Sequence, residues 1–88
     1  MTNQEIAVEI VKLATKSKFA NLTNVSFWQD KYKCKIIEYI FSSILKTQIT
    51  YNDNTDTIHI MSIYRASWQK PLWIHNATKV IGLFRSMK

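Results

Sequence analysis

Apolar residues recur at helical spacing near both ends of the chain. The N-terminal stripe comprises Ile6, Ala7, Ile10, Leu13 and Ala14, and the C-terminal stripe comprises Ala77, Val80, Ile81, Phe84 and Met87. Residues three and four apart share one face of a helix, so each stripe predicts an amphipathic helix. Thr2 and Glu5 have the spacing of a capping box, and this helix is expected to end near Ser17. Asn76 is expected to cap the last helix.

A further helix is predicted in the middle of the chain, from about Phe27 to Lys46. Its polar residues follow at intervals of four, three, four and four, namely Lys31, Lys35, Glu38, Ser42 and Lys46. The rest of the segment is broadly apolar, which favours a helix with a narrow polar stripe. Ser26 and Gln29 fit a second capping box. We expect so apolar a helix to lie centrally or at an interface and to form the spine of the fold.

The segment that follows has the features of a β-hairpin. Gln48–Tyr51 alternates polar and apolar residues, and Thr57–Tyr64 reads as its return strand, with an apolar composition typical of an interior strand. Between them, Asn52–Asp56 is rich in residues that tolerate positive φ angles and bond their own backbone, which predicts a turn. Leu72–His75 is a candidate third strand, and Pro71 restricts it to an edge position.

Taken together, these patterns predict an α+β fold. We expect a small antiparallel sheet of two or three strands, packed with two N-terminal helices and one C-terminal helix. The chain has 88 residues, which is room for a single compact domain over residues 1–88. One Gly and one Pro leave little irregular structure, with a loop expected at Arg65–Gln69.

The chain is strongly basic, with a formal net charge of +6. This balance favours anionic partners such as nucleic acid, nucleotides, acidic proteins or anionic lipids, although positive charge also serves solubility alone. The segment Thr57–Lys88 contains no Asp or Glu. Its cations are Arg65, Lys70, Lys79, Arg85 and Lys88. A ligand site is therefore expected first in this segment.

Cations and aromatic rings alternate between Arg65 and Trp73. Arg65 and Lys70 are suited to phosphate, and Trp68 and Trp73 offer flat faces on which a base stacks. This chemistry fits a nucleotide or a single-stranded nucleic acid. The alternative is that both tryptophans anchor the core and both cations are simply solvated.

The start of the last helix is a second candidate. His75, Asn76, Thr78 and Lys79 surround a helix N-terminus, where free amides and the dipole favour an anion. The alternative is an ordinary Asn76 cap. The glycine-rich approach of a P-loop is missing from this segment. A third run of cations, Lys31, Lys33 and Lys35 beside Tyr32, is expected to be a solvated helix face or to follow a phosphate backbone.

Other classes of function find little support. The single cysteine, Cys34, allows neither an internal disulfide nor a paired-cysteine zinc site, and it favours a reducing cytoplasm. His59 and His75 lack companions for a metal site. No acid stands near a histidine in a catalytic arrangement, so we expect no enzyme, no metal and no cofactor. The polar N-terminus predicts no signal peptide, and the apolar run Ile36–Leu45 is too short and polar to cross a bilayer.

Two functions remain. The first is a non-enzymatic basic binding protein that recognises a phosphate-bearing anionic ligand, nucleic acid or nucleotide, through the cationic and aromatic loop. The second is a protein–protein interaction module, such as a small inhibitor or adaptor of phage type that acts on a host protein or as a homo-oligomer. The second rests on the apolar middle helix, whose exposed face would be self-complementary.

Overall fold

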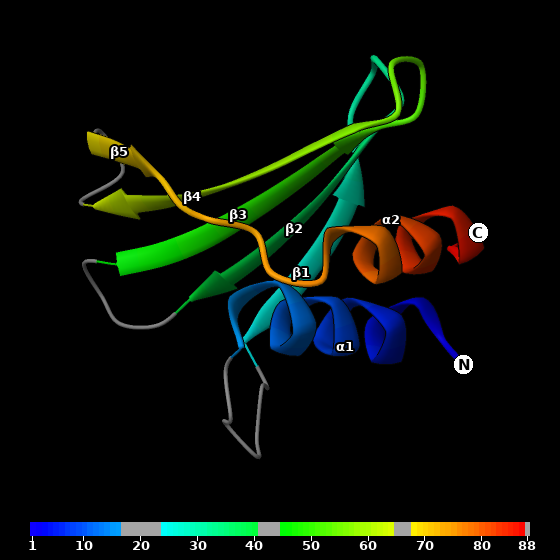
Figure 1. Cartoon of the computed structure of the whole chain (residues 1–88), viewed down its shortest axis with the longest axis horizontal. Coiled ribbons are helices and arrows are strands. Elements are labelled where there is room, and N and C mark those ends of the chain that lie inside the picture. The colour runs from blue at the N-terminus through cyan, green and yellow to red at the C-terminus, as the bar shows by residue number, and fades with distance from the viewer. Residues whose placement is uncertain (17–23, 41–44, 65–67, 88) are drawn as a thin grey trace.

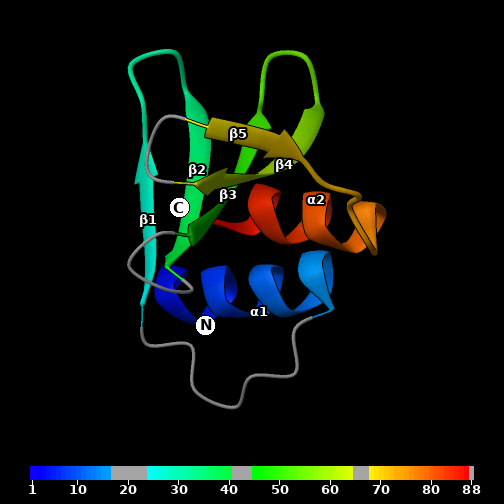
Figure 2. The same cartoon turned by 90° about the vertical axis from the view of Figure 1, so that its left-hand side faces the viewer.

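The computed structural model describes residues 1–16, 24–40, 45–64 and 68–87. The described elements are α1 (Asn3–Thr15), β1 (Val25–Gln29), β2 (Cys34–Ile40), β3 (Leu45–Asn52), β4 (Thr57–Tyr64), β5 (Trp68–Pro71) and α2 (Ala77–Ser86). The strands form one antiparallel sheet in the order β1-β2-β3-β4-β5, so each strand pairs with its sequence neighbour. Figures 1 and 2 show α1 and α2 side by side on the same face of this sheet.

The predicted middle helix is wrong, because its residues form β1, β2 and the start of β3, with residues 41–44 outside the described part. The segment is rich in aromatic and β-branched residues, which favour strands. Its turn depends on Asp30, whose carboxylate accepts hydrogen bonds from the backbone N–H groups of Tyr32 and Cys34, both at 2.9 Å. Lys33 completes the turn with a φ of 65°. The supposed capping box at Ser26 and Gln29 lies within β1.

The predicted polar stripe of that helix is divided between the two faces of the sheet. Lys35 and Ile37 point to the helix-covered face of β2, whereas Ile36 and Glu38 point to the opposite face, since side chains alternate along a strand. Glu38 instead pairs with Lys46 of the adjacent strand, at 3.5 Å. Charged residues three and four positions apart are typical of one helix face. The same spacing also occurs in a strand when both of its faces carry charged residues.

The predicted sheet of two or three strands with three helices is also wrong, because the sheet has five strands and the described residues contain two helices. The candidate strand at Leu72–His75 is displaced, since the structure places the edge strand four residues earlier, at β5. Residues 68–69 therefore belong to a strand rather than to the predicted loop. Pro71 does lie on an edge strand, where its missing N–H is tolerated.

Several local predictions are confirmed. The Thr2 hydroxyl accepts from the Glu5 backbone while the Glu5 carboxylate accepts from the Thr2 backbone, so the capping box forms. The turn at residues 52–56 is organised by the Asn52 side-chain oxygen, which accepts from Asn54 at 2.9 Å. Strand β4 has the predicted bounds and is interior to the sheet. The last helix begins immediately after Asn76.

The core lies between the two helices and one face of the sheet. Ile37, Ile49 and Ile60 are adjacent in the strand register, and all three are almost completely buried. The helices and the residue that follows α2 contribute most of the rest of the cluster, namely Ile6, Ala7, Ile10, Val11, Ala14, Val80, Phe84 and Met87. The three isoleucines therefore identify the helix-covered face, and every other strand residue can be assigned to a face by its register.

Candidate functional site

The first candidate residues lie on the edge strand β5. Trp68 pairs with Tyr64 and Lys70 pairs with Ser62, so Trp68 and Lys70 point to the same face of the sheet as Ile60. Figure 1 shows β5 at the far edge of the sheet from the helices. Trp68 is 61% exposed and Lys70 is exposed as well. The strand thus presents an indole ring and an ammonium group on one accessible face.

The Trp68 ring is supported from one side by Tyr64. The two ring centroids are 4.7 Å apart, with 43° between the ring planes. Such a tilted aromatic contact is favourable and restricts the orientation of both rings. The Tyr64–Trp68 pair therefore forms a partly ordered aromatic surface at the sheet edge.

Trp73 follows the strand and is 80% exposed. Its segment is held by the backbone, because the Leu72 N–H donates to the carbonyl oxygen of Ile60 at 2.9 Å. Neither Trp68 nor Trp73 anchors the core, so the structural alternative for these tryptophans is wrong. Arg65, the remaining member of the predicted loop site, lies outside the described residues.

The start of α2 is arranged differently from the predicted anion site. Asn76 has a φ of 55° and makes no side-chain cap; its side-chain Nδ2 donates instead to the carbonyl oxygen of Leu13, at 3.0 Å. The His75 N–H donates to the Ala14 carbonyl oxygen at 3.0 Å. The positive end of α2 therefore faces the negative end of α1, an arrangement that favours helix pairing over capture of an external anion.

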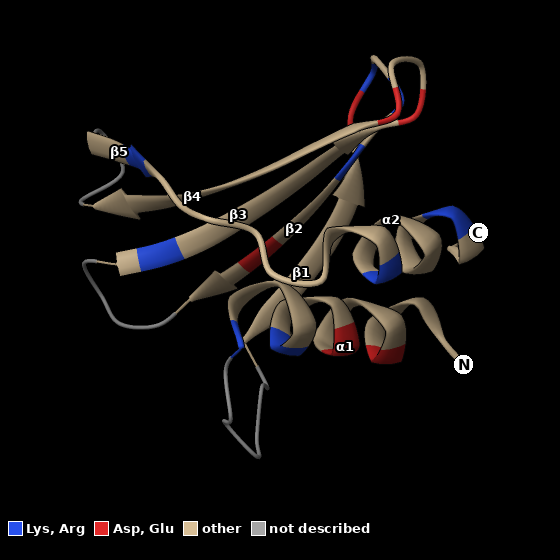
Figure 3. Cartoon of the chain, viewed as in Figure 1, with Lys and Arg blue, Asp and Glu red and all other residues tan. Residues whose placement is uncertain are grey.

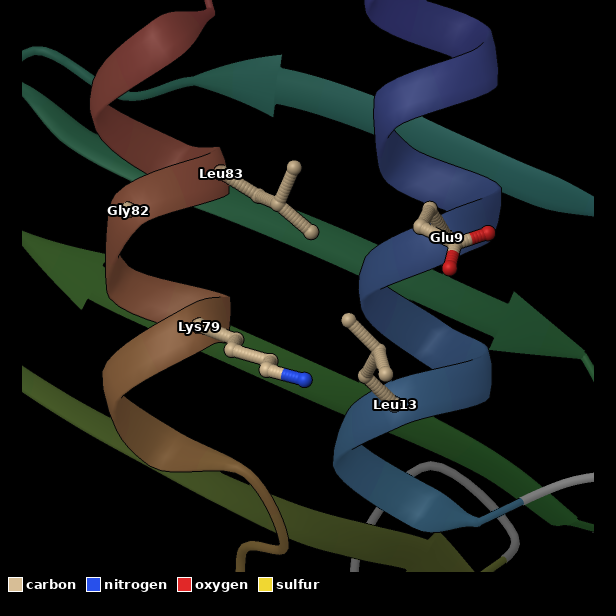
Figure 4. Close-up of a pocket in the computed structure, with 5 residues that line it drawn as sticks. All are labelled: Glu9, Leu13, Lys79, Gly82 and Leu83. Carbon is tan, nitrogen blue, oxygen red and sulfur yellow. The ribbon is translucent and has the colours of Figure 1, made fainter.

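Thr78 and Lys79 are exposed in the first turns of α2. Lys79 lines a hollow of about 390 Å³ between the two helices, together with Glu9, Leu13, Gly82 and Leu83. In Figure 4 the side chains of Lys79 and Leu83 extend from α2, and those of Glu9 and Leu13 extend from α1. Lys79 thus belongs to a helix groove with an acid on its other side. Figure 1 shows α2, which carries Lys79, well apart from β5.

A polar cluster that the sequence did not reveal joins α2 to the turn between β3 and β4. The buried Tyr51 hydroxyl donates to Asp56 Oδ1 at 2.6 Å, and the Arg85 guanidinium contacts the same carboxylate at 2.7 Å. Arg85 Nε also donates to the Tyr51 hydroxyl, at 3.3 Å. The Tyr51 ring stacks on Phe84, with centroids 5.4 Å apart. We call these residues the Tyr51–Asp56–Arg85 cluster.

Each member of this cluster shifts the pKa of the others. The hydrogen bond from Tyr51 lowers the pKa of Asp56, and the contacts with Arg85 lower it further. The hydrogen bond to Asp56 and burial both raise the pKa of Tyr51, against the opposing effect of Arg85. Contacts with Tyr51 and Asp56 raise the pKa of Arg85. All three groups are therefore kept in their ordinary neutral-pH forms, which suits a structural role.

The helix C-terminus receives a second contact from the sheet. Lys35 Nζ donates to the Phe84 carbonyl oxygen at 2.9 Å and lies 3.7 Å from Asp53. A cation at a helix C-terminus satisfies a free carbonyl group and suits the helix dipole. Lys35, which the sequence grouped with a run of solvated cations, is therefore largely structural.

The positive charge of the chain is dispersed. Figure 3 shows Lys and Arg on both helices, on β2, β3 and β5, and in the turn between β1 and β2. In the C-terminal segment, Arg85 is neutralised by Asp56. The predicted concentration of unpaired cations is consequently reduced, among the described residues, to Lys70 at β5 and Lys79 in the helix groove.

Other chemistries have little basis in the described residues. No group of three or more His, Cys, Asp or Glu side chains is placed there to hold a metal ion. Burial raises the pKa of the Cys34 thiol, and the neighbouring Asp30 and Asp53 carboxylates raise it further, which is opposite to the shift of a reactive cysteine. Neither described helix is long and apolar enough to pass through a bilayer.

No family model, curated protein or solved structure matches this chain. The functional argument therefore depends on the geometry of the site and on its chemistry.

Proposed function

We propose that this protein is a non-enzymatic binding protein that recognises a phosphate-bearing ligand with an accessible base, a single-stranded nucleic acid or a nucleotide, along β5. The observation that supports this proposal best is the placement of an exposed Trp68 and an exposed Lys70 on one face of an edge strand. An indole ring provides a stacking surface for a base, and an ammonium group provides a charge for a phosphate.

Two further features support the same ligand. Tyr64 lies against Trp68 and restricts the motion of the Trp68 ring. Because this ring is already partly ordered, less conformational entropy is lost when a base stacks on it. Trp73, 80% exposed, offers another ring three residues beyond Lys70. Arg65 belongs to the proposal through its sequence position after Tyr64, as a second phosphate contact.

The residues at the start of α2 have a smaller part in the proposal. Asn76 and the backbone of His75 are occupied by the carbonyl groups of α1. Thr78 and Lys79 are accessible, and they remain candidates for a peripheral contact with a longer nucleic acid strand.

A fluorescence anisotropy titration with a labelled oligothymidylate tests the proposal. We expect binding that weakens as salt concentration increases, because phosphate contacts release counterions. Trp68→Ala should weaken binding by about 5- to 150-fold, the range expected for loss of one stacked base. Lys70→Ala should weaken binding to all oligonucleotide sequences by a similar factor. It should also reduce the slope of log affinity against log salt concentration by about one, the value for one phosphate contact.

The turn between β1 and β2 supplies matched controls. Tyr32 is 66% exposed, and Lys31 lies over its ring at 5.1 Å, so this pair resembles the proposed site in composition. Tyr32→Ala and Lys31→Ala should leave the affinity close to that of the wild-type protein. ATP should compete better than inorganic tripolyphosphate, because tripolyphosphate has no base to stack. Absence of binding to both the oligonucleotide and ATP at low salt would contradict the proposal, as would equal competition by tripolyphosphate.

A further inference from the structure

The face of the sheet opposite the helices has no described element packed on it. We call it the open face; it comprises the strand residues whose side chains point away from Ile37, Ile49 and Ile60. Apolar side chains reach it from three strands. Trp28 of β1 pairs with Ile36 of β2, and Ile40 lies further along β2. Met61 and Ile63 come from β4, although Ile63 is already buried within the chain.

Some of these apolar side chains are well exposed. Trp28 is 38% exposed and Ile40 is 44% exposed. Together with Ile36 and Met61, they make the open face more apolar than a solvated sheet surface of a small protein needs to be. Exposed apolar groups of this kind typically mark an interaction surface.

The charge of the open face indicates which partner fits it. Among the described residues, its charged side chains are Glu38 and Lys46, which pair with each other at 3.5 Å. The face is thus neutral, and the net charge of +6 belongs to the rest of the chain. A polyanion would find no net attraction here, whereas two copies of a strongly basic chain would meet with the least repulsion through this face.

The ion pair also makes the face complementary to itself. In a two-fold symmetric interface every contact occurs twice, so residue i of one copy meets residue j of the other and the reverse. An axis that passes between β2 and β3 brings Glu38 of each copy towards Lys46 of the other copy. The apolar groups on either side then cover one another as in a packed pair of sheets.

We propose that a second copy of this chain covers the open face, so that the protein is a homodimer with two sheets packed face to face. This surface replaces the apolar middle helix on which self-association was expected from the sequence. The proposal is independent of ligand binding at β5, because the register places Trp68 and Lys70 on the helix-covered side of the sheet.

A charge-exchange experiment tests this dimer by light scattering and sedimentation. The fraction of wild-type protein present as a dimer should increase with protein concentration. Glu38→Lys leaves two cations on the open face, and Lys46→Glu leaves two acids. Because like charges then meet across the interface, the dimer dissociation constant of each variant alone should be at least about tenfold higher than that of the wild-type protein. An equal mixture of the two variants should recover the dimer, which also demonstrates that both chains fold.

Two controls sharpen the result. Glu9→Lys makes the same charge change on the helix groove and should leave the dimer intact. Trp28→Thr removes the largest apolar group from the face while keeping a residue that favours strands, and it should weaken the dimer without new charge. A wild-type protein that stays monomeric, single variants that dimerise normally, or a mixture that fails to recover would each overturn the proposal. A monomeric chain that instead binds a different protein through Trp28 would also overturn it.

Discussion

At the turn between β3 and β4, Tyr51, Asp56 and Arg85 contact one another and tie α2 to the sheet, whereas at β5 the side chains of Trp68, Lys70 and Trp73 extend into solvent. Both regions combine aromatic rings with cations. In the first region each group has a partner within the chain, and Tyr51 is buried. In the second, the cation and two large rings remain accessible. Similar residue types thus serve stability in one place and are available to a ligand in the other.

The largest difference between the two regions should appear on removal of Phe84. This ring is fully buried and stacks on Tyr51. Phe84→Ala should lower the free energy of unfolding by about 3–5 kcal/mol, because it removes buried apolar surface and leaves a cavity. Urea unfolding followed by circular dichroism measures the change. Leu72→Ala, at a position that is 37% exposed, should cost less than about 1 kcal/mol, and an equal loss in both variants would contradict this view of the core.

An intermediate effect is expected from Asp56→Asn. Asn tolerates the φ of 53° at this position, so the change mainly removes the charge that Tyr51 and Arg85 contact. The free energy of unfolding at neutral pH should fall, but by clearly less than in Phe84→Ala, because the contacts of Asp56 are partly exposed to solvent.

The same variant should alter the acid dependence of stability. The pKa of Asp56 is lowered from its ordinary value of 3.8 in the folded protein. Its contribution is therefore complete above the pKa of the unfolded chain and is lost as pH falls through the lower folded value. Asp56→Asn should flatten the acid limb of a pH–stability curve. An unchanged acid limb in Asp56→Asn would show that this carboxylate is not linked to folding.

The smallest effect is expected in the exposed region. Trp73→Ser should change the free energy of unfolding by less than about 0.5 kcal/mol, because a ring that is 80% exposed buries little surface. The same variant should weaken oligothymidylate binding measurably in the anisotropy titration. A large loss of stability with no loss of binding would reverse the comparison and make Trp73 a structural residue.

The fold was predictable where the pattern had one interpretation. The stripes of α1 and α2 match no strand period, and the polar run at residues 52–56 has the composition of a turn, so these elements followed from the residues themselves. The segment from β1 to β2 was ambiguous, because Lys31, Lys35 and Glu38 keep helical spacing although they lie in a turn and on both faces of a strand. Local residue preference for strands was a better guide there than the spacing of charges.

The candidate site was predictable in composition and not in arrangement. The alternation of cations and tryptophans up to Trp73 was visible in the sequence, but the accessibility of those rings depends on where β5 lies in the sheet. Arg85 was grouped with the cations of the acid-free segment Thr57–Lys88, because its acid partner, Asp56, is 29 positions away and lies just before that segment. Only the approach of α2 to the β3–β4 turn shows that this charge is neutralised.

By itself, the sequence determined the two terminal helices, the capping box at Thr2, the turn after β3 and the excess of positive charge. Those properties depend on residues that are near neighbours in the chain or on simple counting. The tertiary structure alone decided that the middle segment pairs as strands, that no described element covers one face of the sheet, and which of the described cations have acid partners. Each of these depends on strand pairing or helix packing between distant segments, and no local pattern records which segments will meet.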